Sequence, residues 1–256
     1  MMDIILQWLG NPAFWAVAAI TVGAGIIKGA IGFAMPMVMA SAFPSFLSPP
    51  EALAATILPV LITNISQSLR QGWQAARQTA WEYRRFLIAT VVSIPISAAF
   101  VDVMPRVVYL LLLGVPITVF AVLQLAGVRM ALRLEQRGRA EWVLGTIGGL
   151  YGGISGIWGP PLLVFLLSIG ADKLETVRVQ GVVFLIGAAM LTVTHLGTGV
   201  LDARTIPLSA LLIVPAWIGL LIGYAVQDRL NPGAFRRWTQ VLLVLTGLNL
   251  VRLALF

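Results

Sequence analysis

Long apolar segments, repeated from end to end, constrain this chain more than any other feature. Helices of about 20 apolar residues cross the roughly 30 Å hydrocarbon core of a bilayer. Eight such segments span about 12–43, 52–69, 86–101, 107–128, 142–169, 177–196, 206–226 and 238–256. Only 11% of the residues are charged, whereas soluble domains carry roughly 25%. The pattern predicts an all-α, multi-pass membrane protein with no soluble domain.

Several function classes are disfavoured by the residue types. The chain has no cysteine and one histidine, and all ten acidic residues fall at segment ends or in loops. Disulfides, thiolate metal sites and cysteine nucleophiles are therefore excluded, and neither a metal nor a cofactor is expected. The net charge of +7 indicates basic cytoplasmic loops rather than nucleic-acid binding. The first ten residues lack a cleavage site and predict a membrane element.

The sequence also resembles itself. A shift of 124 positions places Gly25 on Gly149, Gly29 on Gly153, Gly32 on Gly156, Pro36 on Pro160, and Glu51 on Glu175. Five matches in one register predict two homologous halves, over about 1–127 and 141–256, joined by a basic cytoplasmic linker over 128–140.

The distribution of Lys and Arg predicts how the halves are oriented, because short cytoplasmic loops concentrate these residues. If all eight segments crossed the membrane, 10 basic residues would lie inside and 6 outside. If the segments 12–43 and 142–169 enter and return, 13 lie inside and 3 outside, with Lys28 in the membrane. The second arrangement is favoured. Each half then has one broken re-entrant helix hairpin and three transmembrane helices, and the two repeats are inverted.

The two hairpin tips are the predicted binding site. Non-helical backbone at membrane depth is tolerated where it is buried in protein or lines a polar cavity, and the N-termini of the returning half-helices favour anions. The candidates at the tips are Lys28, Gly29, Gly32, Phe33, Gly153, Ser155, Gly156 and Trp158. The alternatives are that the glycines serve helix packing, that Lys28 extends to the interface and that Trp158 packs in the core.

Polar residues on two other segments extend this prediction. Asn64 and Gln67 belong to a polar stripe on the second segment, and Gln180 lies on the sixth, its repeat partner. Such stripes also occur as polar contacts between helices, but here we expect them to line the same cavity. His195 is more typical of an interfacial or packing residue than of a proton carrier.

The motif "GAGIIKGAIGFAMPMV", repeated as "GGLYGGISGIWGPPLLVF", resembles the sulfite exporter TauE/SafE family of membrane permeases over essentially the whole chain. The resemblance implies transport of sulfite, small organosulfonates or related sulfur-containing anions. The residues by themselves indicate only a small anion.

The main hypothesis is therefore a secondary transporter that moves such an anion by alternating access. The alternative is a passive anion channel. An enzyme is disfavoured, because no carboxylate pair, nucleophile–base couple or metal cluster lies within the segments. The expected partners are the anion and the lipid bilayer of a bacterial inner membrane. The motif Gly219-xxx-Gly223 suggests a homodimer.

Overall fold

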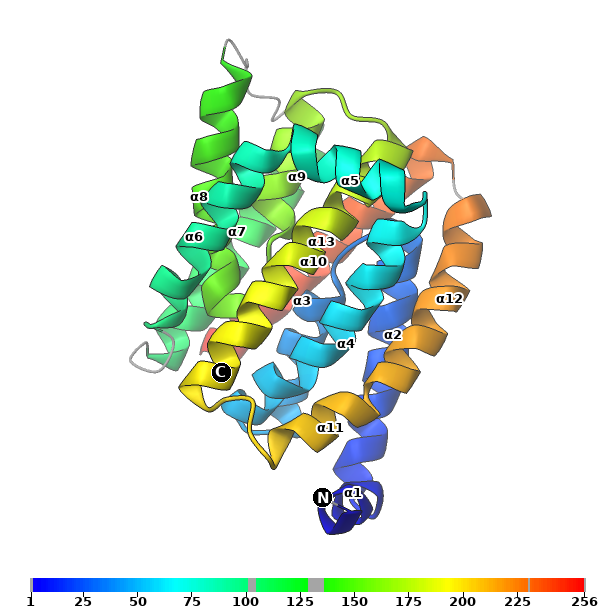
Figure 1. Ribbon diagram of the computed structural model, residues 1–256, viewed down its shortest axis with the longest axis vertical. Coiled ribbons are helices and arrows are strands. Elements are labelled where there is room, and N and C mark those ends of the chain that lie inside the picture. Colours follow the sequence, from blue (N-terminus) through cyan, green and yellow to red (C-terminus); the bar gives the residue numbers. More distant parts are fainter. Residues whose placement is uncertain (1, 101–104, 129–135, 230, 256) are drawn as a thin grey trace.

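Helices form the whole of the regular structure in the residues that the computed structural model describes, which are 2–100, 105–128, 136–229 and 231–255. The longer helices run roughly along the long axis of the molecule (Figure 1). Four helical segments are long and apolar enough to cross a membrane: Pro12–Ile31, Pro50–Leu69, Lys173–Thr198 and Thr205–Arg229. Most of the linker expected at 128–140, and residue 101 at the end of the third segment, lie outside the described residues.

The first half of the chain contains eight helical elements among its described residues. They are α1 (Met2–Leu9), α2 (Pro12–Ile31), α3 (Met35–Ala42), the short 3-10 helix η1 (Phe43–Ser45), α4 (Pro49–Leu69), α5 (Trp73–Glu82), α6 (Arg84–Ala98) and α7 (Arg106–Leu125). The second half contains α8 (Arg137–Ser155), α9 (Gly159–Ser168), α10 (Lys173–Thr198), α11 (Thr205–Leu211), α12 (Ile213–Arg229) and α13 (Pro232–Leu255).

The first long apolar segment is broken between α2 and α3. Gly32 ends α2 with a φ of 88°, and its N–H donates to the carbonyl of Lys28 at 2.7 Å. A left-handed residue of this kind is the usual way to end a helix, and glycine adopts it without steric cost. Ala34 follows with a φ of 77°, the one positive value at a non-glycine residue in the described ranges. Pro36 then sits in the first turn of α3, where its missing N–H leaves no bond unmade.

The second break repeats the left-handed glycine and the proline 124 positions later, whereas Trp158, the counterpart of Ala34, has a φ of −107°. Gly156 ends α8 with a φ of 69°, and its N–H donates to the carbonyl of Gly152 at 2.7 Å. Pro160 lies in the first turn of α9. Both breaks therefore lie inside the duplicated Gly/Pro motifs.

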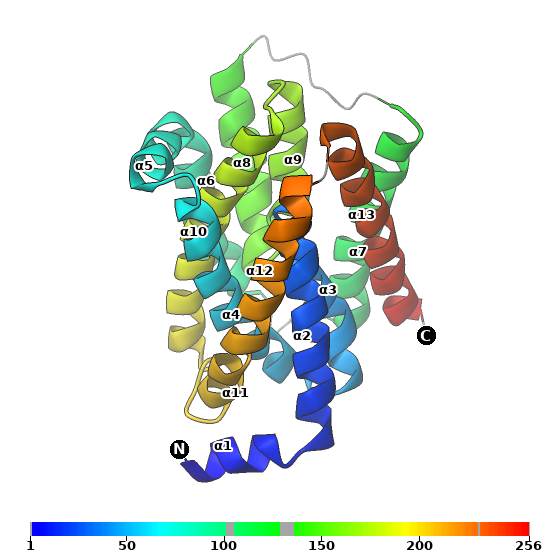
Figure 2. The same ribbon diagram turned by 90° about the vertical axis from the view of Figure 1, so that its right-hand side faces the viewer.

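Each break reverses the direction of the chain (Figure 2). The helix α2 rises from the end of the molecule that holds α1, and α3 returns toward that end; α8 starts at the opposite end, and α9 returns toward it. The two hairpins thus enter the bundle from opposite ends.

Helices of the two halves pair across the bundle. The hairpin helix α2 packs on α12, while α8 packs on α6; α4 packs on α10 and α7 on α13. Glycines allow the closest approaches, because a Cβ atom built on Gly29 would lie 2.7 Å from the Cα of Gly223. Gly219 and Gly223 are both buried against α2. The Gly219-xxx-Gly223 motif therefore packs on α2 of the same chain and does not by itself indicate a dimer. The homodimer stays a prediction.

Basic residues gather at the end where α8 begins, and they connect elements of both halves there. Arg70 at the end of α4 forms an ion pair with Asp228 at 2.7 Å. Lys173 at the start of α10 donates to the carbonyl of Gln227 at 2.7 Å, and the Tyr83 hydroxyl donates to Glu175 at 2.8 Å. Exposed ion pairs stabilise a fold by only about 0–1 kcal/mol each. The gathering of basic residues therefore matters mainly because it makes one end of the molecule more basic than the other.

Two elements differ from the simple spans that hydropathy suggests. The basic loop over 70–85 contains a helix, α5, which lies across the basic end (Figure 1) and exposes Trp73 and Trp81. The seventh segment is interrupted between α11 and α12. Pro215, in the first turn of α12, explains this interruption, because it has no N–H to donate to the carbonyl four residues earlier.

Candidate functional site

A buried lysine lies directly before the first break. Lys28 occupies the last turn of α2 and is 1% exposed. Its Nζ donates to Oδ1 of Asn64 on α4, and none of the ion pairs in the described part of the chain involves Lys28. Its position near the C-terminus of α2 is favourable for a positive charge, because the helix carbonyls point toward it. Among the described residues, however, the hydrogen-bond partner of its Nζ is a neutral amide.

Two glutamines surround the same break. Gln67 on α4 uses its Nε2 to donate to the carbonyls of Gly32 at 2.8 Å and Val177 at 2.9 Å, so it connects the break to α10. Gln180 on α10 is fully buried, and a Cβ atom built on Gly32 would lie 2.5 Å from its Oε1. The structure therefore brings Lys28, Gly32, Asn64, Gln67 and Gln180 together.

Several polar atoms of this cluster have no hydrogen-bond partner in the described chain. They are Nδ2 of Asn64, Oε1 of Gln67, and both amide atoms of Gln180. A buried polar group without a partner costs about 1–3 kcal/mol, and such groups are rare unless a ligand or water satisfies them. Two of these atoms, Nδ2 of Asn64 and Nε2 of Gln180, are donors, as is the Lys28 ammonium. The cluster can therefore bind a group that accepts hydrogen bonds and carries negative charge.

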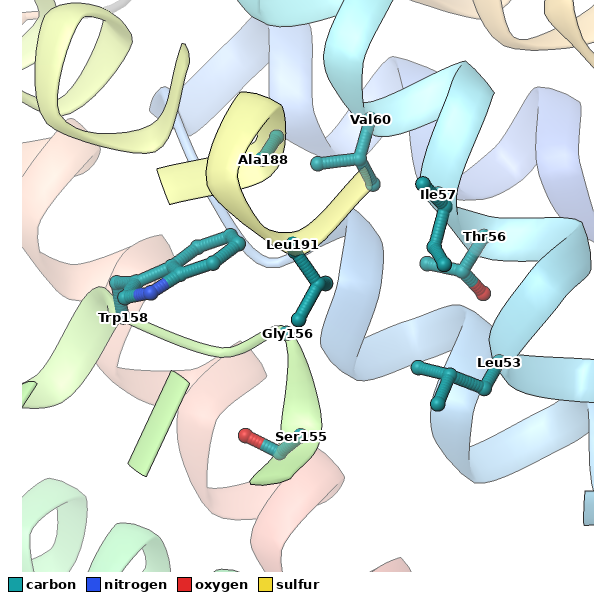
Figure 3. A pocket seen from close by; sticks show the side chains of 9 residues that line it. All are labelled: Leu53, Thr56, Ile57, Val60, Ser155, Gly156, Trp158, Ala188 and Leu191. Atoms are coloured by element: carbon teal, nitrogen blue, oxygen red, sulfur yellow. The ribbon is translucent and has the colours of Figure 1, made fainter. Parts of the chain in front are cut away.

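The second break lines a small pocket (Figure 3). Its walls come from the break, from α4 and from α10: Leu53, Thr56, Ile57, Val60, Ser155, Gly156, Trp158, Ala188 and Leu191. The lining is mainly apolar, and the free space is comparable to that of about one water molecule. The Trp158 ring packs on Phe184 with ring centroids 6.0 Å apart.

The Ser155 hydroxyl is used within the break. It donates to the carbonyl of Tyr151 at 2.7 Å and accepts from the N–H of Ile157 at 3.1 Å. The hydrogen of this hydroxyl is therefore committed to the helix. Ser155 stabilises the turn at the end of α8, and its role as a ligand for an anion stays a prediction.

The three remaining candidates pack against other elements. A Cβ atom built on Gly29 or Gly153 would overlap the backbone of α12 or of α6, so these two glycines permit close helix packing. The Phe33 ring extends from the first break to the second, where a Cβ atom on Gly159 would lie 3.1 Å from its Cδ2. The two breaks are thus in contact through Phe33. Binding of an anion at Gly29, Phe33 or Gly153 stays a prediction.

Sequence reasoning missed the apolar members of the pocket. Leu53, Ile57, Val60, Ala188 and Leu191 look like ordinary core residues, because any helix of a membrane bundle carries such side chains on its packed face. Only their positions on two related helices could have indicated that they line a common pocket. Each lies on α4 or α10, and the 124-residue shift relates those two helices.

Comparison with known proteins identifies the family. The profile of the sulfite exporter TauE/SafE family matches residues 17–250, which is nearly the whole chain. The chain belongs to this family. A search of curated proteins and a search of solved structures gave no match.

Membership of the TauE/SafE family and the four apolar helices identify an integral membrane protein. The family consists of membrane transporters rather than enzymes, and it implies transport of sulfite or a related anion. In the described ranges, no group of three or more His, Cys, Asp or Glu residues could hold a metal ion.

Proposed function

We propose that this TauE/SafE family member is a secondary transporter that carries sulfite or a small organosulfonate by alternating access. The observation that carries the proposal is the buried Lys28, which has no carboxylate partner among the described residues and lies beside unpaired amide groups at a helix break. A cation buried in the membrane is costly, by at least about 2.5 kcal/mol on insertion scales. An anion bound next to Lys28 would balance this charge.

The cluster has the donors that such an anion requires. A trigonal-pyramidal or tetrahedral sulfur oxyanion presents three oxygen atoms, which can accept from Nζ of Lys28, Nδ2 of Asn64 and Nε2 of Gln180. The N–H groups of Met35 and Met37 in the first turn of α3 would add to this set, because the first turn of a helix leaves its N–H groups without intrahelical acceptors. Neutral amides and one ammonium would replace the water that the anion loses on entering the bundle.

Alternating access requires two conformations, and the proposed symmetry gives them a structural basis. We infer that the halves are inverted repeats related by a pseudo-two-fold axis in the membrane plane. Three observations support this inference: the matching breaks at Gly32 and Gly156, the entry of the hairpins from opposite ends, and the cross-pairing of helices. In particular, α2 on α12 and α8 on α6 are the same contact with the halves exchanged.

The orientation follows from charge. The end that holds α5 also holds Arg70, Arg137 and Lys173, and basic residues concentrate on the cytoplasmic side of a membrane. We therefore place this end in the cytoplasm and the other end outside, in a bacterial inner membrane. The hairpin α2–α3 then enters from outside and α8–α9 from the cytoplasm.

Flux of labelled anions in proteoliposomes tests the function. The panel is sulfite, thiosulfate, sulfate, sulfoacetate, phosphate and chloride, each with and without unlabelled anion on the opposite side. A carrier gives saturable flux of a sulfur anion that unlabelled substrate on the opposite side accelerates. Conductance without saturation or counterflow would instead identify a passive channel. No anion flux from folded protein would exclude both.

A further inference from the structure

We propose that the apolar pocket at the second break receives the organic substituent of an anion whose acid group is held by the polar cluster at the first break. This inference rests on the proposed function, because it concerns the same substrate. It assigns a separate specificity subsite to Trp158, Ala188, Leu191 and their neighbours on α4 (Figure 3).

The pocket and the polar cluster occupy equivalent positions in the two halves. At the first break, Gln67 lies against Gly32: a Cβ atom built on Gly32 would be 3.6 Å from its Nε2. At the second break, Leu191 lies against Gly156: a Cβ atom built there would be 3.5 Å from its Cδ2. Gln67 and Leu191 are 124 positions apart, as are Gly32 and Gly156. The same contact is therefore made once by an amide and once by a methyl group.

The difference in chemistry extends to the other members of the two sites. The corresponding pairs are Lys28 with Gly152, Asn64 with Ala188, Gln67 with Leu191, and Gln180 with Thr56. At each pair the first break has an ammonium or amide side chain. The second break has a smaller or apolar side chain, and the Thr56 hydroxyl donates to its own helix at Ala52, 2.9 Å away. Duplication thus gave one polar half-site and one apolar half-site.

The two half-sites are close enough to hold the ends of one molecule. Val60, in the pocket wall, precedes Asn64 by four residues on α4. Residues with this spacing lie on one helix face, about 6 Å apart along the axis. An acid group bound at Asn64 would direct a chain of a few carbon atoms toward Val60 and the pocket. The free space there accepts a terminal group about the size of a methyl, since it is comparable to one water molecule.

Burial of a hydrocarbon chain sets the expected size of the effect. Each methylene group removed from water strengthens binding by about fourfold. Inorganic sulfite gains nothing from the pocket. Affinity is therefore expected to rise about fourfold per carbon atom along a series of unbranched alkanesulfonates, until the terminal methyl fills the pocket, and to fall for longer chains.

Inhibition of labelled sulfite counterflow by 1-alkanesulfonates, from methane- to hexanesulfonate, tests this expectation. Ala188→Leu fills the pocket and should remove the dependence of the inhibition constant on chain length. Leu191→Ala enlarges it and should shift the tightest inhibitor to a longer chain. The matched control is Ala189→Leu, because Ala189 is the next residue of α10 and is exposed; it should leave the series as in the wild type.

The possible results distinguish a failure of the substituent pocket from a failure of the proposed transport function. If sulfite is carried but all the alkanesulfonates inhibit equally in the wild type, the pocket is not a substituent site, while the transport function stands. The same conclusion follows if Ala188→Leu and Ala189→Leu change the series alike, or if Leu191→Ala leaves the preferred chain length in place. If the wild-type protein is folded and carries no anion, the proposed function and the inference both fail.

Discussion

Replacing Lys28 with methionine separates a functional charge from a structural one. Methionine replaces the four-atom apolar stem of the lysine side chain with one of the same number of atoms and removes the ammonium. The empty protein loses the hydrogen bond to Asn64, worth about 1.5–3 kcal/mol for a charged donor. It also loses the penalty of at least about 2.5 kcal/mol for holding a charge within the bilayer. These contributions oppose each other, so the free energy of unfolding should change little.

Anion binding should respond very differently. Two opposite charges about 4 Å apart attract by about 4 kcal/mol at an effective dielectric constant of about 20. Removing one of them should weaken binding by two to three orders of magnitude, since about 1.4 kcal/mol corresponds to a factor of ten. The expected phenotype of Lys28→Met is therefore near-normal stability with a large loss of sulfite flux at low substrate concentration.

Two measurements on the same preparation check this prediction: thermal unfolding in detergent, and the concentration dependence of sulfite flux in proteoliposomes. Arg77→Met, on the exposed face of α5, controls for the loss of one positive charge and should leave the affinity unchanged. The reasoning is refuted if Lys28→Met binds sulfite as tightly as the wild type. It is refuted equally if the variant is severely destabilised and its flux falls only in proportion to the folded fraction.

Further substitutions test the packing and the breaks. Gly149→Val would place a Cβ atom 2.5 Å from a carbonyl oxygen of α6 and should lower the free energy of unfolding by at least about 1–3 kcal/mol; Gly23→Ala, which meets nothing within 4 Å, should not. Gly156→Ala forces a residue with a Cβ atom into a φ of 69° and should cost about 1–2 kcal/mol of stability in thermal unfolding. Burial, together with the hydrogen bond to Glu175, raises the pKa of Tyr83 above its ordinary value of 10.0, so its contribution is complete below pH 10 and is lost as pH rises further. Tyr83→Phe should therefore lower the unfolding temperature at neutral pH, and denaturation followed across alkaline pH should show the difference from wild type shrinking.

The sequence predicted the helical class and the positions of the two breaks because these depend on local chemistry. Glycine followed by proline, within an apolar segment, specifies a left-handed helix end and a new first turn at Gly32 and at Gly156. The helix α5 was not predicted, because the basic residues over 70–85 indicated a cytoplasmic loop. Its burial of Ala76 and Thr79 against the bundle depends on tertiary packing that composition does not report.

The site was only partly predictable for a related reason. Lys28, Asn64 and Gln67 stood out because a charge or an amide in an apolar segment is unusual. Which of them meet depends on the register between α2, α4 and α10, and hydropathy gives no register between helices. The sequence also could not distinguish the structural roles of neighbouring glycines. Gly29 permits a close helix contact and Gly32 ends a helix, but both are glycines of one motif.

The exchange of helix partners between the halves has a consequence for movement. Gly25 and Gly29 of α2 approach the backbone of α12 closely, and Gly149 and Gly153 of α8 approach that of α6. Backbones in such contact cannot slide without collision. In the proposed alternating-access cycle, we therefore expect each hairpin and its partner helix to move together as one rigid body, which contains parts of both halves of the chain. We then expect the flexing to occur at α4 and α10, which pack on each other and contact α12 and α6 respectively, and not at the boundary between the two halves of the sequence.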